Sequence, residues 1–433
     1  MNRLRLAAEK IRGLLAGRTK VKASLYYASS SLVCQAMRFC GLIISTRLID
    51  KTQFGFFAQG VLALSFAAML RDVGQINALL SYRGEDRRYA VFNFQLNAGL
   101  GLFATALLWA VLAAVPGIPD ELRRAAPLLA GITLAEILTQ TGLVMAQKAF
   151  RFRMLARVEI GALAVWLATL AASVTRIEGC MALFAAQFAE VAFRFAAVFI
   201  ASGRRYLGWT GGNDLRRFYF SEFARYLIPQ NILQTLAGRL DFLLLSFFST
   251  REELGIYERM LQYIRIPWSL SINLIDRVLL ISYSREQDDP AALRKTLRKS
   301  TRLVAAAVIA ATGAATLAVA FVLKFFIGPE WARTILAHWW VALPFTLLTP
   351  FVWNLNIFCQ GTGRAAQLLR NTAFLLIATA VAGLLAAPAH GALGMLLAQG
   401  AAYAALLLFQ IKMVRAFLAE KSTADRTGES SGN

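Results

Sequence analysis

Residues 89–115 read YAVFNFQLNAGLGLFATALLWAVLAAV and contain no charged side chain. About 20 apolar residues in a row are enough for a helix to cross the hydrocarbon of a bilayer. Eleven other segments share this length and character, so we predict an all-α integral membrane protein with about twelve transmembrane helices. The helices are expected at residues 24–48, 54–80, 89–115, 125–146, 158–176, 181–202, 218–248, 256–283, 303–327, 333–360, 371–388 and 391–415.

The composition of the whole chain agrees with this reading. Of the 433 residues, 58% are hydrophobic and 16% are charged. Soluble globular domains are about 45–50% apolar and about 25% charged. The composition therefore excludes an ordinary soluble enzyme and a disordered protein.

The chain is strongly basic, with 46 Lys and Arg against 25 Asp and Glu. Such an excess is typical either of nucleic-acid binding or of the cytoplasmic loops of a membrane protein. Here the basic residues concentrate in alternate connections, beginning with the N-terminal segment. The positive-inside rule then predicts that both termini are cytoplasmic and that nucleic acid is not a partner.

An internal repeat suggests how the helices are grouped. Phe54-Gly55 begins one predicted helix and Leu254-Gly255 immediately precedes another, at an offset of 200 residues. We therefore expect two six-helix lobes around a central cavity, arranged as parallel repeats. The predicted parts are an amphipathic cytoplasmic segment (1–22), an N-terminal lobe (23–202), a cytoplasmic linker (203–217), a C-terminal lobe (218–417) and a disordered tail (418–433).

Polar side chains follow one face of several predicted helices. A charge at the centre of a membrane helix costs at least about 2.5–3.5 kcal/mol, so arginines near mid-span need a reason. Arg38, Arg239 and Arg265 lie near mid-span, and each belongs to a polar stripe. Because a guanidinium binds phosphate oxygens in pairs, we predict a water-filled cationic cavity for an anionic ligand. The other predicted binding residues on these stripes are Gln35, Asn231 and Gln262.

The role of the acidic residues inside the predicted helices can be interpreted in two ways. They either pair with basic residues and hold helices together, as the i,i+4 spacing of Glu190 and Arg194 indicates, or they couple transport to an ion gradient. The candidates for coupling or gating are Asp72, Glu136, Asp241 and Asp276.

The sequence gives no sign of a cofactor or of a metal site. The four cysteines form no C-x-x-C pair, there are two histidines, and no G-x-x-x-x-G-K-[ST] motif is present. We expect neither a cofactor nor a bond-making reaction.

Five segments carry a resemblance to a known family: Thr46–Gly55 (TRLIDKTQFG), Arg71–Leu80 (RDVGQINALL), Arg239–Leu244 (RLDFLL), Leu254–Arg259 (LGIYER) and Ser282–Asp289 (SYSREQDD). They resemble corresponding segments of polysaccharide-unit flippases, in the superfamily of multidrug, oligosaccharidyl-lipid and polysaccharide exporters. The resemblance implies a two-lobed fold of twelve to fourteen helices around a central cavity.

The resemblance also implies a function. It is the translocation of undecaprenyl-diphosphate-linked oligosaccharide across the bacterial inner membrane, for exopolysaccharide, capsule or O-antigen (lipopolysaccharide) assembly. Membrane lipids, a polysaccharide polymerase and chain-length or export proteins are the implied partners. Two alternatives stay open, namely a cation-coupled drug exporter of the same superfamily and a non-transporting membrane protein of polysaccharide assembly.

Overall fold

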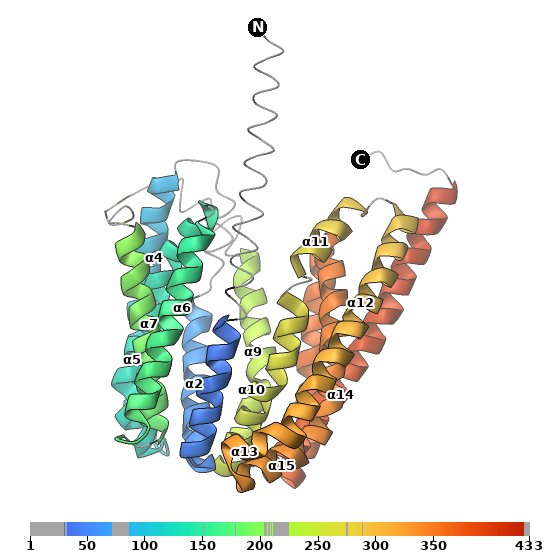
Figure 1. Ribbon diagram of the computed structural model, residues 1–433. Coiled ribbons are helices and arrows are strands. Elements are labelled where there is room, and N and C mark those ends of the chain that lie inside the picture. The colour runs from blue at the N-terminus through green and yellow to red at the C-terminus, as the bar shows by residue number, and fades with distance from the viewer. Residues whose placement is uncertain are drawn as a thin grey trace. The chain divides into compact units, whose positions relative to one another are not determined.

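The computed structural model describes residues 30, 33–71, 86–149, 151–177, 179–202, 206, 208, 210, 225–273, 276–287 and 289–427. These residues form helices joined by short turns, and no strand occurs among them (Figure 1). The prediction of an all-α membrane protein is confirmed.

The chain divides into two compact units. Unit 1 comprises residues 1–48 and 63–231, and unit 2 comprises residues 49–62 and 232–433. The start of the second predicted span is thus grouped with the C-terminal half of the chain. The predicted lobe boundaries, and a cavity between the lobes, stay predictions.

Unit 1 is built on four long helices that lie side by side in Figure 1. They are α4 (Asp86–Ala114), α5 (Asp120–Lys148), α6 (Phe152–Ser173) and α7 (Gly179–Ser202). Helix α5 packs against both α4 and α7, and α6 packs against α7. Small residues allow close packing: Gly131 meets Phe188 and Gly161 meets Phe193, both on α7. Residues 33–48 form one further helix of this unit.

Unit 2 contains the first part of α2 (Lys51–Arg71) and most of α9 (Arg225–Phe248). Its other elements are α10 (Arg251–Asn273), α11 (Asp276–Arg285), α12 (Pro290–Leu317), the π-helix η3 (Ala318–Val322), α13 (Leu323–Ile327), α14 (Pro329–Gly361) and α15 (Ala365–Thr427). Helix α14 is central, since it packs against α10, α11, α12 and α15. Large aromatic side chains fill the unit, including Trp339, Tyr257 and Phe358, all buried.

The predicted spans compare well with the described helices. Eight of these helices are long and apolar enough to cross a membrane. One of them, α15, contains the last two predicted spans, separated by a kink at Gly391 (φ 53°, ψ −129°). The span predicted at 256–283 covers most of α10 and α11, and residues 274–275 between them lie outside the described residues. Because α10 carries several charged residues along its length, its mean hydropathy is low.

Candidate functional site

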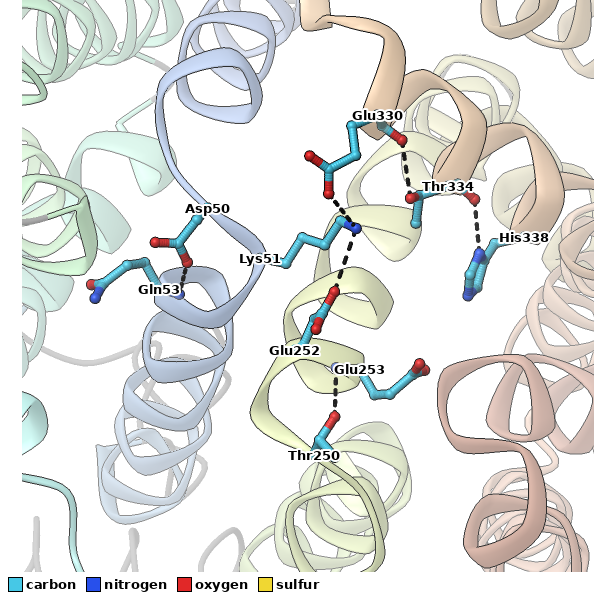
Figure 2. Close-up of polar contacts among 9 residues, drawn as sticks. All are labelled: Asp50, Lys51, Gln53, Thr250, Glu252, Glu253, Glu330, Thr334 and His338. Carbon is cyan, nitrogen blue, oxygen red and sulfur yellow. Dashed lines mark hydrogen bonds and ion pairs between the residues drawn. The ribbon is translucent and has the colours of Figure 1, made fainter.

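Helices α2 and α10 begin in the same way, 200 residues apart. The Oδ1 of Asp50 accepts a hydrogen bond from the backbone N of Gln53 at 2.8 Å, and the Oγ1 of Thr250 accepts one from Glu253 at 3.3 Å. Figure 2 shows both contacts. Each side chain satisfies a backbone donor that the first turn of a helix leaves without a partner. The two helix starts therefore match at the offset of 200 residues noted in the sequence.

A pair of glycines lets these two helix starts touch. A Cβ atom on Gly55 would collide with the carbonyl oxygen of Arg251, and one on Gly255 would collide with that of Lys51. The two contacts are reciprocal, and each involves backbone atoms that a rotamer change cannot move. We conclude that only glycine fits at either position in this arrangement.

Three first turns meet around the side chain of Lys51. Its Nζ lies 2.8 Å from Glu330 on α14 and 3.4 Å from Glu252 on α10, as drawn in Figure 2. It also lies 5.9 Å from the centre of the Trp331 ring. A lysine at a helix N-terminus is opposed by the helix dipole, whereas glutamates there are favoured. The two glutamates thus stabilise a cation that its own helix disfavours. We call Lys51, Glu252 and Glu330 the N-terminal charge cluster.

A buried arginine lies about two turns beyond Glu252 along α10. The guanidinium of Arg259 stands 3.3 Å from the centre of the Phe54 ring and donates to Gln262 at 2.8 Å. Gln262 donates in turn to Glu258 at 2.7 Å. Arg259 and Glu258 are both buried. Gln262, predicted to bind ligand, therefore connects two buried charges in this structure.

Unit 2 contains a cavity of about 270 Å³ beside α9 and α10. Its lining includes Asp241, Arg265, Gln399 and Tyr403. Asp241 is only 5% exposed and accepts hydrogen bonds from the Tyr257 hydroxyl at 2.6 Å and from the Phe242 backbone N at 2.9 Å. The structure thus brings together two residues predicted separately, an arginine for ligand and a carboxylate for coupling.

Arg239 and Arg265 are close enough for their charges to interact. Arg239 is half-buried and lies 5.6 Å from the centre of the Phe242 ring, while Arg265 is exposed. Within the described residues, neither guanidinium has a carboxylate at ion-pair distance. The nearby charge of Arg265 disfavours that of Arg239, whereas the carboxylates of Glu258 and Asp241 favour it. An anion bound near the two guanidinium groups would be attracted by both of them.

In unit 1, the charges are arranged around Arg194. Its Nη2 lies 2.6 Å from Glu190 and 3.2 Å from Glu159. The i,i+4 pair expected from sequence is therefore present. Arg38 joins the same group at 3.6 Å from Glu190, with its side chain 54% exposed. The half-buried Glu136 also interacts electrostatically with Arg194.

The remaining predicted residues are placed as follows. Gln35 and Asn231 are half-buried, in the 33–48 helix and in α9. Asp276 is the first residue of α11, and Asp72 lies outside the described residues. Because Arg38 belongs to unit 1, whereas Arg239 and Arg265 belong to unit 2, a cavity shared by all three stays a prediction.

Sequence reasoning missed several residues that these clusters contain. Lys51 and Glu330 lie in turns that the span prediction treated only as connections, and Glu159 lies at a predicted helix end. Tyr257 belongs to the Leu254–Arg259 segment that carries the family resemblance, but no contact was predicted for it. In the part of the chain that the structure describes, no three His, Cys, Asp or Glu side chains are grouped as metal ligands would be.

The chain matches one family profile, described as polysaccharide biosynthesis protein, over residues 44–336. No curated protein sequence matches it.

Several solved structures are similar in fold. One is the lipid II flippase MurJ in an inward closed conformation, at a TM-score of 0.71 and 11% identity, with 94% of each chain covered. Another is a multidrug resistance MATE family transporter of the MOP superfamily in an inward-facing conformation, at a TM-score of 0.68 and 12% identity, with 92% of this chain and 96% of that chain covered. A third is a MOP superfamily transporter from Pyrococcus furiosus described as having a binding pocket of reverse polarity, at a TM-score of 0.61 and 14% identity, with 93% and 96% covered. At these identities the likeness shows the fold.

Proposed function

Because the chain belongs to the family of polysaccharide biosynthesis proteins, we propose that it is a flippase for undecaprenyl-diphosphate-linked oligosaccharide units in the bacterial inner membrane. The units would serve assembly of exopolysaccharide, capsule or O-antigen, together with a polymerase and chain-length or export proteins. The likeness in fold to a protein described as a lipid II flippase supports this proposal. Both termini would be cytoplasmic, in keeping with the distribution of basic residues.

The observation that carries the proposal is the pair Arg239 and Arg265. The charge of Arg239 interacts with Arg265 and also with Asp241 and Glu258, and the cavity of about 270 Å³ is lined by Arg265 and Asp241. A diphosphate has oxygens enough to accept from two guanidinium groups at once, and each such bond is charge-assisted. The pair would thus bind the head of the lipid-linked substrate.

The transport step requires no bond to be made or broken. Binding to arginine reduces the cost of holding a diphosphate where the dielectric is low. The sugars would stay in polar surroundings and the prenyl chain in lipid while the protein alternates between two conformations. Arg38, half of whose side chain is exposed, would provide a third cationic contact during this cycle.

The N-terminal charge cluster would close one end of the pathway. The loops that precede α2, α10 and α14 are all predicted to be external. The contacts of Lys51 with Glu252 and Glu330, together with the glycine contact between α2 and α10, hold the three first turns together. In the proposed cycle these contacts break when the external end opens.

The proposal is tested by export of the surface polysaccharide from cells that carry single variants. Arg239→Gln and Arg265→Gln remove a charge and keep a hydrogen-bonding side chain. Each should reduce export at least about tenfold at unchanged protein level, the loss expected for one charge-assisted contact. Arg298→Gln is the matched control, since Arg298 is an exposed residue of α12 away from the cavity. Undiminished export in both test variants would overturn the proposal.

A second candidate function is a cation-coupled drug exporter. The observation that favours it is the buried carboxylate of Asp241 on the cavity wall, because a carboxylate can bind a cation or a proton. This alternative predicts that deletion of the gene sensitises cells to cationic dyes and leaves the glycan profile unchanged. A flippase predicts accumulation of cytoplasm-facing lipid-linked units instead. A non-transporting scaffold would keep its function after loss of all three arginines.

A further inference from the structure

A second and larger cavity lies in unit 1. Its volume is about 660 Å³, within the range of pockets that bind small molecules. It is formed where the start of α4, the end of α5, the start of α6 and the end of α7 come together, so it lies at one end of the unit. The connections at this end are predicted to be cytoplasmic. With that topology, the cavity would lie at the level where the membrane meets the cytoplasm.

Two arginines stand at this cavity. Arg87 lies in the first turn of α4, and Arg151 immediately precedes α6. Both are exposed. Among the described residues, neither has a carboxylate at ion-pair distance. Both also lie at helix N-termini, whose partial positive charge adds to their own.

The rest of the wall is apolar or only weakly polar. Ala90, Ala146 and Ala149 leave space that larger side chains would fill, and Met145 and Met154 provide flexible apolar surface. Tyr206 is buried and accepts a hydrogen bond from Ser202 at 3.0 Å, which fixes two hydroxyl groups at the edge of the cavity. The cavity thus combines two cationic groups with an apolar wall.

We propose that this cavity binds the phosphate headgroup of a membrane lipid. The guanidinium groups of Arg87 and Arg151 bind the phosphate oxygens, and the first part of the lipid chain lies against Met145, Met154 and the alanines. A free phosphate ion would use the arginines and leave the apolar wall uncovered, so an amphiphile fits better. This site does not depend on the proposed function, since lipids with phosphate headgroups surround membrane proteins whatever those proteins transport.

The test measures lipid retention by the purified full chain. The protein is held in neutral detergent, and native mass spectrometry counts bound phosphatidylglycerol and, in a second arm, bound undecaprenyl phosphate. The double variant Arg87→Gln/Arg151→Gln should retain at least about tenfold less of whichever lipid binds. The matched control is Arg153→Gln/Arg157→Gln, which removes two exposed charges from α6 that do not line the cavity, and it should retain lipid as the parent does.

A second variant tests the apolar wall. Ala149 is exposed and lines the cavity, so Ala149→Trp fills space without entering the packed core. It should reduce lipid retention several-fold while both arginines remain. Equal lipid retention in the two double variants would overturn the site. Inorganic phosphate and free lipid are then compared as competitors at equal concentration. If phosphate displaces the bound lipid as well as free lipid does, the preference for an amphiphile is overturned.

Discussion

Lys51 and Glu330 form an ion pair of 2.8 Å that joins the first turn of α2 to the first turn of α14. The lysine side chain is 16% exposed and the glutamate 75% exposed. Lys51 is thus largely covered, and its second partner, Glu252, lies on a third helix. The relationship matters because one side chain holds three helix starts together.

Removing the charge of Lys51 should loosen this end of the helices. In Lys51→Gln, Glu252 and Glu330 lose their shared cation and repel each other. A single cysteine placed at position 334, one turn into α14, should then react roughly two to five times faster with a membrane-impermeant maleimide. The same cysteine in Arg298→Gln is the control, because Arg298 is an exposed residue of α12 outside the charge cluster.

Charge exchange separates an ionic role for Lys51 from a steric one. Lys51→Glu alone places three carboxylates together and should raise the reaction rate further. Lys51→Glu combined with Glu330→Lys restores an opposite pair and should return the rate toward that of the parent. If the combined variant reacts as fast as Lys51→Glu, the ion pair is not what holds this end closed.

The glycine contact predicts opposite effects for similar substitutions. Gly55→Ala and Gly255→Ala place a methyl group against the backbone of the facing helix, and each should lower the free energy of unfolding by about 1–3 kcal/mol. Gly313→Ala, on α12, meets nothing within 4 Å and should raise it by up to about 1 kcal/mol. Thermal unfolding in detergent measures all three. Similar unfolding temperatures for Gly55→Ala and Gly313→Ala would contradict the close helix contact.

Much of the architecture follows from the sequence, because a helix that crosses the lipid needs about 20 predominantly apolar residues. The charge-free run at 89–115 corresponds to α4. The repeated Phe54-Gly55 and Leu254-Gly255 lie in the first turns of α2 and α10, where the structure shows why glycine is needed. The family resemblance drawn from these segments is confirmed by the family match.

Apart from the pair of Glu190 and Arg194 within one helix, the partners of the charged residues did not follow from the sequence. Periodicity identifies the face of a helix on which a residue lies, but it cannot identify the helix that this face meets. Arg38 was predicted to face a cavity, yet it also contacts Glu190 on α7.

The hydrogen bond between Tyr257 and Asp241 should be important for stability. Tyr257→Phe leaves a buried carboxylate with one backbone donor and should lower the free energy of unfolding by about 1–3 kcal/mol. Asp241→Asn keeps an acceptor for the hydroxyl and should cost less. A double-mutant cycle monitored by thermal unfolding gives the coupling between them. Strictly additive effects would show that the two side chains do not act as a pair.

The cluster around Arg194 offers a way to separate stability from transport. Glu190→Gln leaves the half-buried Arg194 with Glu159 as its one remaining ion-pair partner among the described residues, and breaking a buried pair costs about 3–5 kcal/mol at most. We therefore expect a clear fall in unfolding temperature, together with a low protein level in the membrane.

Arg38→Gln should behave differently from Glu190→Gln. Arg38 is more exposed than Arg194, and it lies at a longer distance, 3.6 Å, from Glu190. Such a pair contributes less than about 1 kcal/mol, so the unfolding temperature should be nearly that of the parent. If Arg38 contacts the diphosphate during transport, export should nevertheless fall about tenfold. Arg38→Lys keeps the charge and loses the paired donors, so its export should lie between that of the parent and that of Arg38→Gln. A parallel loss of stability and export in Arg38→Gln would assign this arginine to the structural cluster alone.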